Sequence, residues 1–180
     1  MKHLVLSLVM STFATAAFAE NAAPLSPEQT WQLLQDKGDE VLFVDVRDPV
    51  EIMFIGFTDA VDINLPFKLV DRHEFIEQKK QFAMKTNPDF VSGVEKALHD
   101  KGLDKDALVI TMCRSGATRG KPSAEYLMEH GFTNVNYVET GFQGDKAKEG
   151  DQKGMRVVNG WMNSDLPWSG SINPDKIYQP

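Results

Sequence analysis

The chain has 180 residues, of which 42% are hydrophobic and 25% are charged, with 13 Gly, 9 Pro and a single Cys. This composition is typical of a globular protein, and it excludes collagen-like, coiled-coil and disordered classes. The single cysteine excludes an intrachain disulfide framework and cysteine-rich zinc sites, while the formal net charge of −7 argues against nucleic acid as a partner.

Residues 1–19 have the pattern of a cleaved secretory signal peptide. A basic start precedes an apolar run over 4–10, and Ala17-Phe18-Ala19 has the small-residue spacing of a cleavage site. The apolar run is too short for a membrane span, so no membrane partner is expected after cleavage. We therefore expect cleavage before Glu20 and a periplasmic or secreted protein.

Residues 20–25 are interpreted as a linker, and a helix is predicted to begin directly after it. Ser26 is the expected N-cap, with Pro27 at the first helical position and Gln29 placed to complete a capping box. Gly38 is the expected stop.

The chain then alternates between strand and helix signals. The apolar runs over 41–46 and 107–112 are continuous, which is typical of parallel strands buried on both faces. Shorter strand signals cover 61–65 and 135–138, and helices are predicted over 48–51, 68–84, 89–100 and 122–130. The pattern predicts an α/β fold with an open parallel sheet flanked by helices.

One domain is expected over residues 26–150. The segment 151–180 is predicted to be a C-terminal tail that packs on this domain, with Trp161 and Trp168 as aromatic anchors rather than walls of a substrate pocket. The stretch 67–89 is interpreted as a solvated helical face rather than a partner surface.

Cys113 directly follows the strongest strand signal and precedes the loop Arg114, Ser115, Gly116, Ala117, Thr118 and Arg119. An unpaired cysteine in an exported protein is either buried and inert or retained for its chemistry. A strand-to-helix loop points N–H groups inward, and the next helix adds its positive end. With two guanidinium groups nearby, this loop is expected to favour a thiolate and to bind an anion beside it.

At this point the chain resembles the rhodanese-like domain family. The resemblance covers about residues 26–145 and rests on four separated motifs. They are Val44-Asp45-Val46-Arg47 with Glu51, Ile63-Asn64-Leu65-Pro66, Val109-Ile110-Thr111-Met112-Cys113-Arg114-Ser115-Gly116, and Gly131-Phe132-Thr133-Asn134-Val135 with Gly141-Phe142. The resemblance implies a sulfurtransferase in which Cys113 accepts a sulfane sulfur as a persulfide held by the loop amides, with no metal or organic cofactor.

The same resemblance implies the partners. A small anionic donor such as thiosulfate would supply the sulfur, and cyanide or a thiol would accept it. Because the chain holds no second thiol, a protein sulfur acceptor or a reductant is a further candidate partner.

The loop departs from the common rhodanese pattern in its length. Arg119 lies six positions after Cys113, where the common loop places its second Arg five positions after Cys, so one residue is inserted. The resulting Cys-x5-Arg spacing is that of cysteine-dependent phosphatases, and related arsenate reductases also use a longer loop. Those proteins usually have His before the Cys, whereas this chain has Met112. Oxyanion chemistry and a non-catalytic module that binds an anion or persulfide therefore stay open beside sulfur transfer.

Asp45 and Arg47 are candidate supporting residues, because they end a buried strand at the same side of the sheet as the loop. They are interpreted either as groups that orient the loop or as an internal ion pair. The histidines have no spacing typical of metal ligands, so no metal site is predicted.

Overall fold

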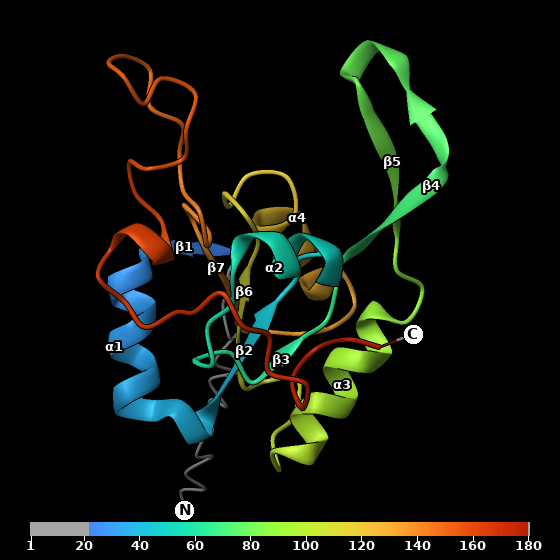
Figure 1. The fold of residues 1–180 in the computed structure, drawn as a ribbon. Coiled ribbons are helices and arrows are strands. Elements are labelled where there is room, and N and C mark those ends of the chain that lie inside the picture. Colours follow the sequence, from blue (N-terminus) through green and yellow to red (C-terminus); the bar gives the residue numbers. More distant parts are fainter. Residues whose placement is uncertain (1–21, 180) are drawn as a thin grey trace, which may run out of the picture.

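A computed structural model describes residues 22–179, so the predicted signal peptide and its cleavage site lie outside the described residues. Parallel strands form one sheet in the order β1-β7-β6-β2-β3. They are β1 (Ala23–Leu25), β2 (Val41–Asp45), β3 (Ile63–Asn64), β6 (Leu108–Met112) and β7 (Val135–Val138). Helices flank this sheet (Figure 1), which confirms the predicted α/β class.

The helices are α1 (Pro27–Lys37), α2 (Pro49–Ile55), α3 (Phe90–Asp100) and α4 (Gly120–Glu129), with short 3₁₀ turns η1 (Gly38–Glu40), η2 (Glu77–Lys79) and η3 (Trp161–Asn163). Two of the helices, α1 and α2, begin where the capping signals predict, whereas α4 begins two residues before its predicted start at 122. The capping box is confirmed, because the Ser26 hydroxyl accepts from the Gln29 N–H while the Gln29 side chain accepts from the Ser26 N–H. The segment 23–25, interpreted as linker, is instead the edge strand β1.

The core lies on both faces of the sheet. Alternate residues of β2 and β6 belong to two separate clusters, which is why both strands are apolar at nearly every position. One cluster packs under α3 and α4 and includes Cys113. The other packs under α1 and α2 and is completed by Trp161 of the C-terminal segment.

The predicted helix over 68–84 is wrong. The segment forms an antiparallel hairpin of β4 (Lys68–Ile76) and β5 (Gln81–Thr86), which turns at Lys80 in a left-handed conformation. Phe75 and Phe82 are paired across the hairpin with ring centroids 5.5 Å apart. Their seven-residue spacing fits two helical turns as well as a hairpin pair, so the pattern alone did not separate the two structures.

Two projections rise beyond the carboxyl ends of the strands. One is the β4–β5 hairpin, drawn in green in Figure 1, and the other is the irregular segment 145–158, drawn in orange. The orange segment, here called the arm, is closed by an isolated bridge between Lys146 and Arg156. Among residues 22–179, no helix is long and apolar enough to cross a membrane.

Candidate active site

Cys113 lies at the carboxyl end of β6, the middle strand of the sheet. Ligands bind at this edge of open α/β sheets, because the loops that follow the strands converge there. The cysteine has 0% exposure and forms no disulfide among the described residues. The loop 114–119 then connects it to α4.

The loop is held against a neighbouring turn that follows β7. The Phe142 N–H donates to the Cys113 carbonyl at 2.7 Å, and the Gln143 N–H donates to the Arg114 carbonyl at 2.8 Å. Gly116 has a φ of 75°, and a Cβ there would lie 1.7 Å from the Glu139 carbonyl oxygen. A side chain at this position is therefore excluded by both conformation and space.

The loop leaves most of its N–H groups free. The Ala117 N–H donates to the Ser115 carbonyl, but no hydrogen bond to another described residue is donated by the N–H groups of 114–116, 118 and 119. Gly120, the first residue of α4, lies against the sulfur, since a Cβ there would be 3.5 Å from Cys113 Sγ. Unpartnered N–H groups in a loop that leads into the start of a helix are suited to holding an anion.

Arg119 lies inside the site and is only 6% exposed. Its Nη2 donates to both carboxylate oxygens of Glu51, at 2.9 and 3.0 Å, whereas its Nη1 is buried without a partner among the described residues. Burial lowers the pKa of Arg119, but the Glu51 carboxylate, with Cys113 and Asp45, outweighs burial and raises that pKa overall. Arg119 therefore stays charged beside the cysteine.

Arg114 lies nearer to solvent and is held differently. Its Nε donates to Gln143 Oε1 at 2.7 Å, and no ion pair forms with a described residue. Burial lowers the pKa of Arg114, and the charges of Arg156, Arg119 and Arg47 lower it further, against the opposing charge of Glu51. Several cations therefore crowd one small region.

Asp45 and Arg47 form a fully buried ion pair with a 2.6 Å contact. The Arg47 guanidinium lies 4.0 Å from the centroid of the Phe142 ring and donates to the Gly56 carbonyl. Since the Phe142 N–H binds the Cys113 carbonyl, this pair supports the turn that holds the loop. Both sequence interpretations of the pair, internal ion pair and loop support, fit this arrangement.

The loop opens into a cavity of about 500 Å³ between the hairpin and the arm. Four loop residues line it, namely Arg114, Ser115, Thr118 and Arg119. Lys68, Lys79 and Arg156 also line it, although no sequence motif connects them with the loop. No local spacing could have done so, because the hairpin and the arm bring them to the loop from distant parts of the chain.

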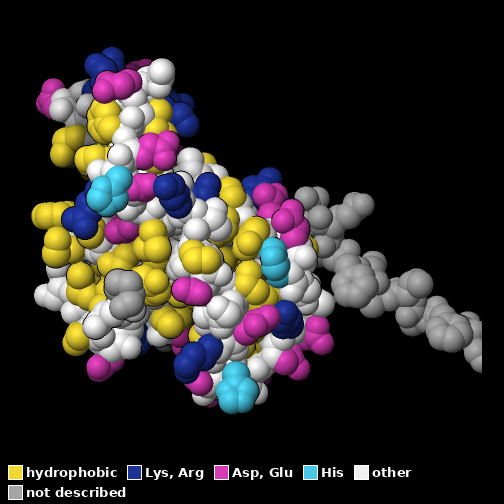
Figure 2. All heavy atoms as spheres, turned by 90° about the vertical axis from the view of Figure 1, so that its right-hand side faces the viewer, with side chains coloured by type: hydrophobic (Ala, Val, Ile, Leu, Met, Phe, Trp, Pro, Cys, Tyr) yellow, Lys and Arg dark blue, Asp and Glu magenta, His cyan; other side chains and the backbone are white. Residues whose placement is uncertain are grey.

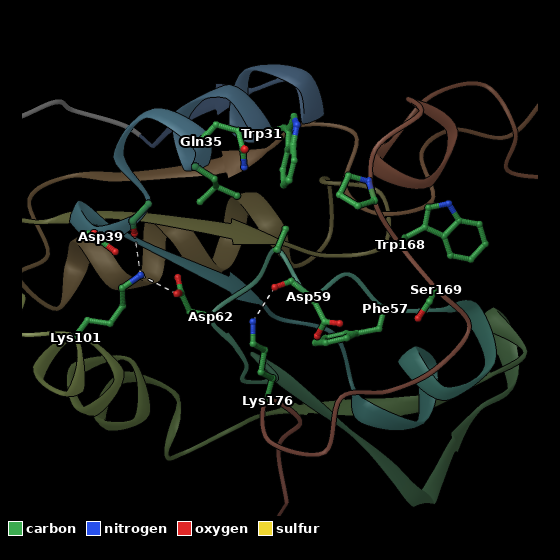
Figure 3. Close-up of a pocket in the computed structure, with 14 residues that line it drawn as sticks. Trp31, Gln35, Asp39, Phe57, Asp59, Asp62, Lys101, Trp168, Ser169 and Lys176 are labelled. Carbon is green, nitrogen blue, oxygen red and sulfur yellow. Dashed lines mark hydrogen bonds and ion pairs between the residues drawn. The ribbon is translucent and has the colours of Figure 1, made fainter.

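A second cavity, of about 640 Å³, lies between α1 and the C-terminal segment (Figure 3). Both of its lysines already have partners. Lys101 donates to the Asp62 carboxylate and to two carbonyls, and Lys176 donates to the carbonyls of Asp59 and Val61. Trp168 lines this cavity at 42% exposure, whereas Trp161 is buried in the core. No residue of the cysteine loop lines it, and residues 22–179 hold no group of three or more His, Cys, Asp or Glu that could bind a metal ion.

Comparison with known proteins finds relatives that share one name. The tRNA uridine(34) hydroxylase of Corynebacterium efficiens is 29% identical over 130 residues, 71% of this chain and 34% of that protein. The protein of the same name from Corynebacterium glutamicum is 27% identical over 148 residues, 82% of this chain and 36% of that protein. The chain thus spans about a third of the length of these curated relatives.

Solved structures support the same fold. The crystal structure of Rv0390 from M. tuberculosis superimposes with a TM-score of 0.61 at 27% identity, over 84% of this chain and all of that one. The family model for the rhodanese-like domain matches residues 26–148. With the strand order, the loop after β6 and this match in agreement, the chain belongs to the rhodanese-like domain family.

Proposed function

We propose that this protein is a sulfurtransferase that carries a sulfane sulfur on Cys113. The Cys113 thiolate attacks the outer sulfur of thiosulfate, the S–S bond of the donor breaks, and sulfite leaves with the electron pair. The resulting persulfide then gives its outer sulfur to cyanide or a thiolate, which restores the Cys113 thiolate. Charge and electrons balance in both steps, so no oxidant, metal or organic cofactor is needed.

The observation that carries this proposal is a loop of unpartnered amides that directly follows a buried cysteine. The N–H groups of 114–116, 118 and 119 have no partner among the described residues, and the positive end of α4 adds to them. Unpartnered amides of this kind can hold the anionic outer sulfur of a persulfide, while Arg119 compensates its charge. A buried structural cysteine would need none of these groups.

A second candidate rests on the Cys-x5-Arg spacing. Arg119 reaches the inside of the loop with one free Nη1, which also fits a bound tetrahedral oxyanion. Phosphoester or arsenate chemistry and anion binding without catalysis are therefore the alternatives that the experiment below must distinguish from sulfur transfer. Hydroxylation, the activity in the name of the relatives, is not proposed, because about two thirds of those proteins have no counterpart in this chain.

Intact-mass analysis of the purified protein tests the proposal. After incubation with thiosulfate and removal of the donor, the mass should rise by one sulfur atom, and cyanide should remove that atom as thiocyanate. Cys113→Ser keeps the size of the side chain but cannot form a persulfide, so it should show no gain. A phosphoenzyme formed from a generic phosphoester would instead support the second candidate, and no adduct with either reagent would favour anion binding alone.

We also propose that the protein works outside the cytoplasm, on the basis of the leader pattern in residues 1–19. N-terminal sequencing of protein from the exported fraction should begin at Glu20. A cell-associated protein that still begins at Met1 would contradict export.

A further inference from the structure

The cavity above the cysteine loop is formed by four separate parts of the chain, one of which is Glu51 of α2. The loop supplies the floor, the β4–β5 hairpin supplies one wall and the arm supplies Arg156. Its volume, about 500 Å³, is within the range of sites that bind small organic molecules. A site for an inorganic donor alone would not need this much space.

Cations dominate the lining of this cavity. Lys68, Lys79, Arg114, Arg119 and Arg156 line it, and Glu51 is the only carboxylate among the lining residues. Glu51 is already paired with Arg119, and the other four cations form no ion pair within residues 22–179. The protein as a whole has a net charge of −7, so this concentration of positive charge is local.

The face of the molecule that Figure 2 shows has no such concentration of positive charge. The face in Figure 2 shows Lys and Arg intermixed with Asp and Glu around apolar side chains. Within the cavity, in contrast, the charges of the neighbouring guanidinium groups lower the pKa of Arg114, in addition to the larger effect of burial. A bound anion would relieve this repulsion, whereas an additional cation would increase it.

Arg156 is fixed at the edge of the cavity. Its Nη1 donates to the Gly144 carbonyl, and its Nε is buried without a partner among the described residues. It lies beyond residues 26–148, so the arm adds it to the matched domain. The hairpin contributes Ile76 and Met84 as well as its lysines, which gives the cavity an apolar wall beside the charges.

Burial of the cysteine divides the site into two zones. Cys113 has 0% exposure and does not itself line the cavity, so it leaves no room for the body of an organic substrate beside its sulfur. The body of such a substrate must stay in the cavity above. There an aliphatic chain could lie against Ile76 and Met84, with an anionic group at Lys68, Lys79 or Arg156.

On the basis of the proposed sulfur transfer, we propose that the cavity selects aliphatic thiols that carry a carboxylate or sulfonate group as the sulfur acceptors of this enzyme. The acceptor thiolate attacks the outer sulfur of the Cys113 persulfide. The S–S bond breaks, Cys113 leaves as thiolate, and the acceptor becomes an anionic persulfide. The carboxylate and the sulfonate share the charge that the cavity recognises.

Three-carbon thiols of matched length test this inference. The full chain is first loaded with thiosulfate, and transfer is then measured to 3-mercaptopropanol, 3-mercaptopropionate and 3-mercaptopropanesulfonate at equal thiolate concentrations. We expect kcat/KM for the anionic thiols to exceed that for the neutral thiol by about tenfold, since a charge-assisted contact is worth roughly one decade or more. The ratio between the two anions distinguishes a carboxylate site from a sulfonate site.

Substitutions then locate the preference. Lys68→Gln and Arg156→Gln should each reduce the ratio of anionic to neutral transfer at least threefold, through KM rather than kcat. Arg72→Gln removes an exposed hairpin cation that does not line the cavity and should keep the parent ratio. The ratio compares two acceptors with the same variant, so a change in the amount of folded protein does not affect it. If Arg156→Gln fails to fold, Lys68→Gln still tests the cavity, because it leaves the arm intact.

The outcomes separate the two proposals. If the parent forms no persulfide with thiosulfate, the proposed function fails. If it forms the persulfide and transfers sulfur equally to neutral and anionic thiols, the proposed function holds and the acceptor inference is overturned. The inference is also overturned if both cavity variants keep the parent ratio.

Discussion

The two ends of the Arg119 guanidinium have different partners. Nη2 is bound by both oxygens of Glu51, whose side chain is 21% exposed, while Nη1 is buried and unpartnered among the described residues. An unsatisfied buried donor costs free energy unless a ligand satisfies it. Glu51 therefore positions Arg119, and the free Nη1 is the part available to an anion near Cys113.

Replacing Arg119 with Ala should raise the KM for thiosulfate at least tenfold. The substitution removes a charge-assisted hydrogen bond to the anion, worth about 1.5–3 kcal/mol, or about one to two decades in affinity. Arg114→Ala should have a smaller effect, since Arg114 is less buried and its Nε is bound to Gln143. Steady-state kinetics on both variants would check this order.

Glu51→Gln provides the control for this prediction. It keeps the shape of the side chain but removes the charge that holds Arg119, so it tests positioning without removing the guanidinium. We expect a KM between those of the parent and Arg119→Ala. Equal KM values for Arg114→Ala and Arg119→Ala would contradict the prediction that Arg119 is the main contact of the bound anion.

At the scale of elements, strands with two buried faces were the most predictable. The runs around β2 and β6 are apolar at consecutive positions because helices cover both sides of the sheet. The sequence pattern predicts a helix where the hairpin lies, because Phe75 and Phe82 have a spacing common to both structures. β1 has only three residues, and its pairing with β7 rather than a local pattern makes it a strand.

The cysteine loop was predictable for a different reason. Cys113, the free amides and Arg119 are contiguous in sequence, so a strand followed by a helix start already places them together. Lys68 and Arg156 reach the site only through the hairpin and the arm. Their role depends on tertiary structure, which a local spacing cannot encode.

The inserted residue of the loop gives a prediction at this scale. Thr118 is exposed and lines the cavity, so its deletion restores the commoner spacing without removing a core side chain. If the protein transfers sulfur, the deletion variant should keep or improve thiosulfate:cyanide activity. If it acts on oxyanions, the shorter loop should abolish phosphoester or arsenate activity, because it leaves less room for a tetrahedral oxyanion.

Measuring both reactions in parent and deletion variant separates these cases. Thermal unfolding of the variant is followed in parallel, so that a loss of activity is interpreted only in a folded protein. Loss of sulfur transfer from a folded variant would show that the longer loop is required for this chemistry, against the expectation.

For the whole molecule, the C-terminal segment is connected to the cysteine loop through a short series of contacts. Trp161 is fully buried, packs edge-on against Trp31 at 6.0 Å and lies 5.5 Å from Phe43. Its backbone N–H donates to the Gly141 carbonyl, and the next residue along the chain donates to the Phe142 carbonyl. Since Phe142 in turn holds the Cys113 carbonyl, the segment supports both the core and the site.

Trp161→Ala should therefore reduce both stability and sulfur transfer. Loss of a fully buried Trp costs about 3–5 kcal/mol, measurable as a lower free energy of unfolding in urea. Trp168→Ala is the comparison, because Trp168 is 42% exposed although its ring packs edge-on against Phe142 with centroids 6.1 Å apart, and it should cost less stability than Trp161→Ala. At temperatures where Trp161→Ala is still folded, its kcat should fall, since the turn that holds the loop has lost its support. If the variant is destabilised but transfers sulfur at the parent rate, the segment stabilises the fold without positioning the cysteine.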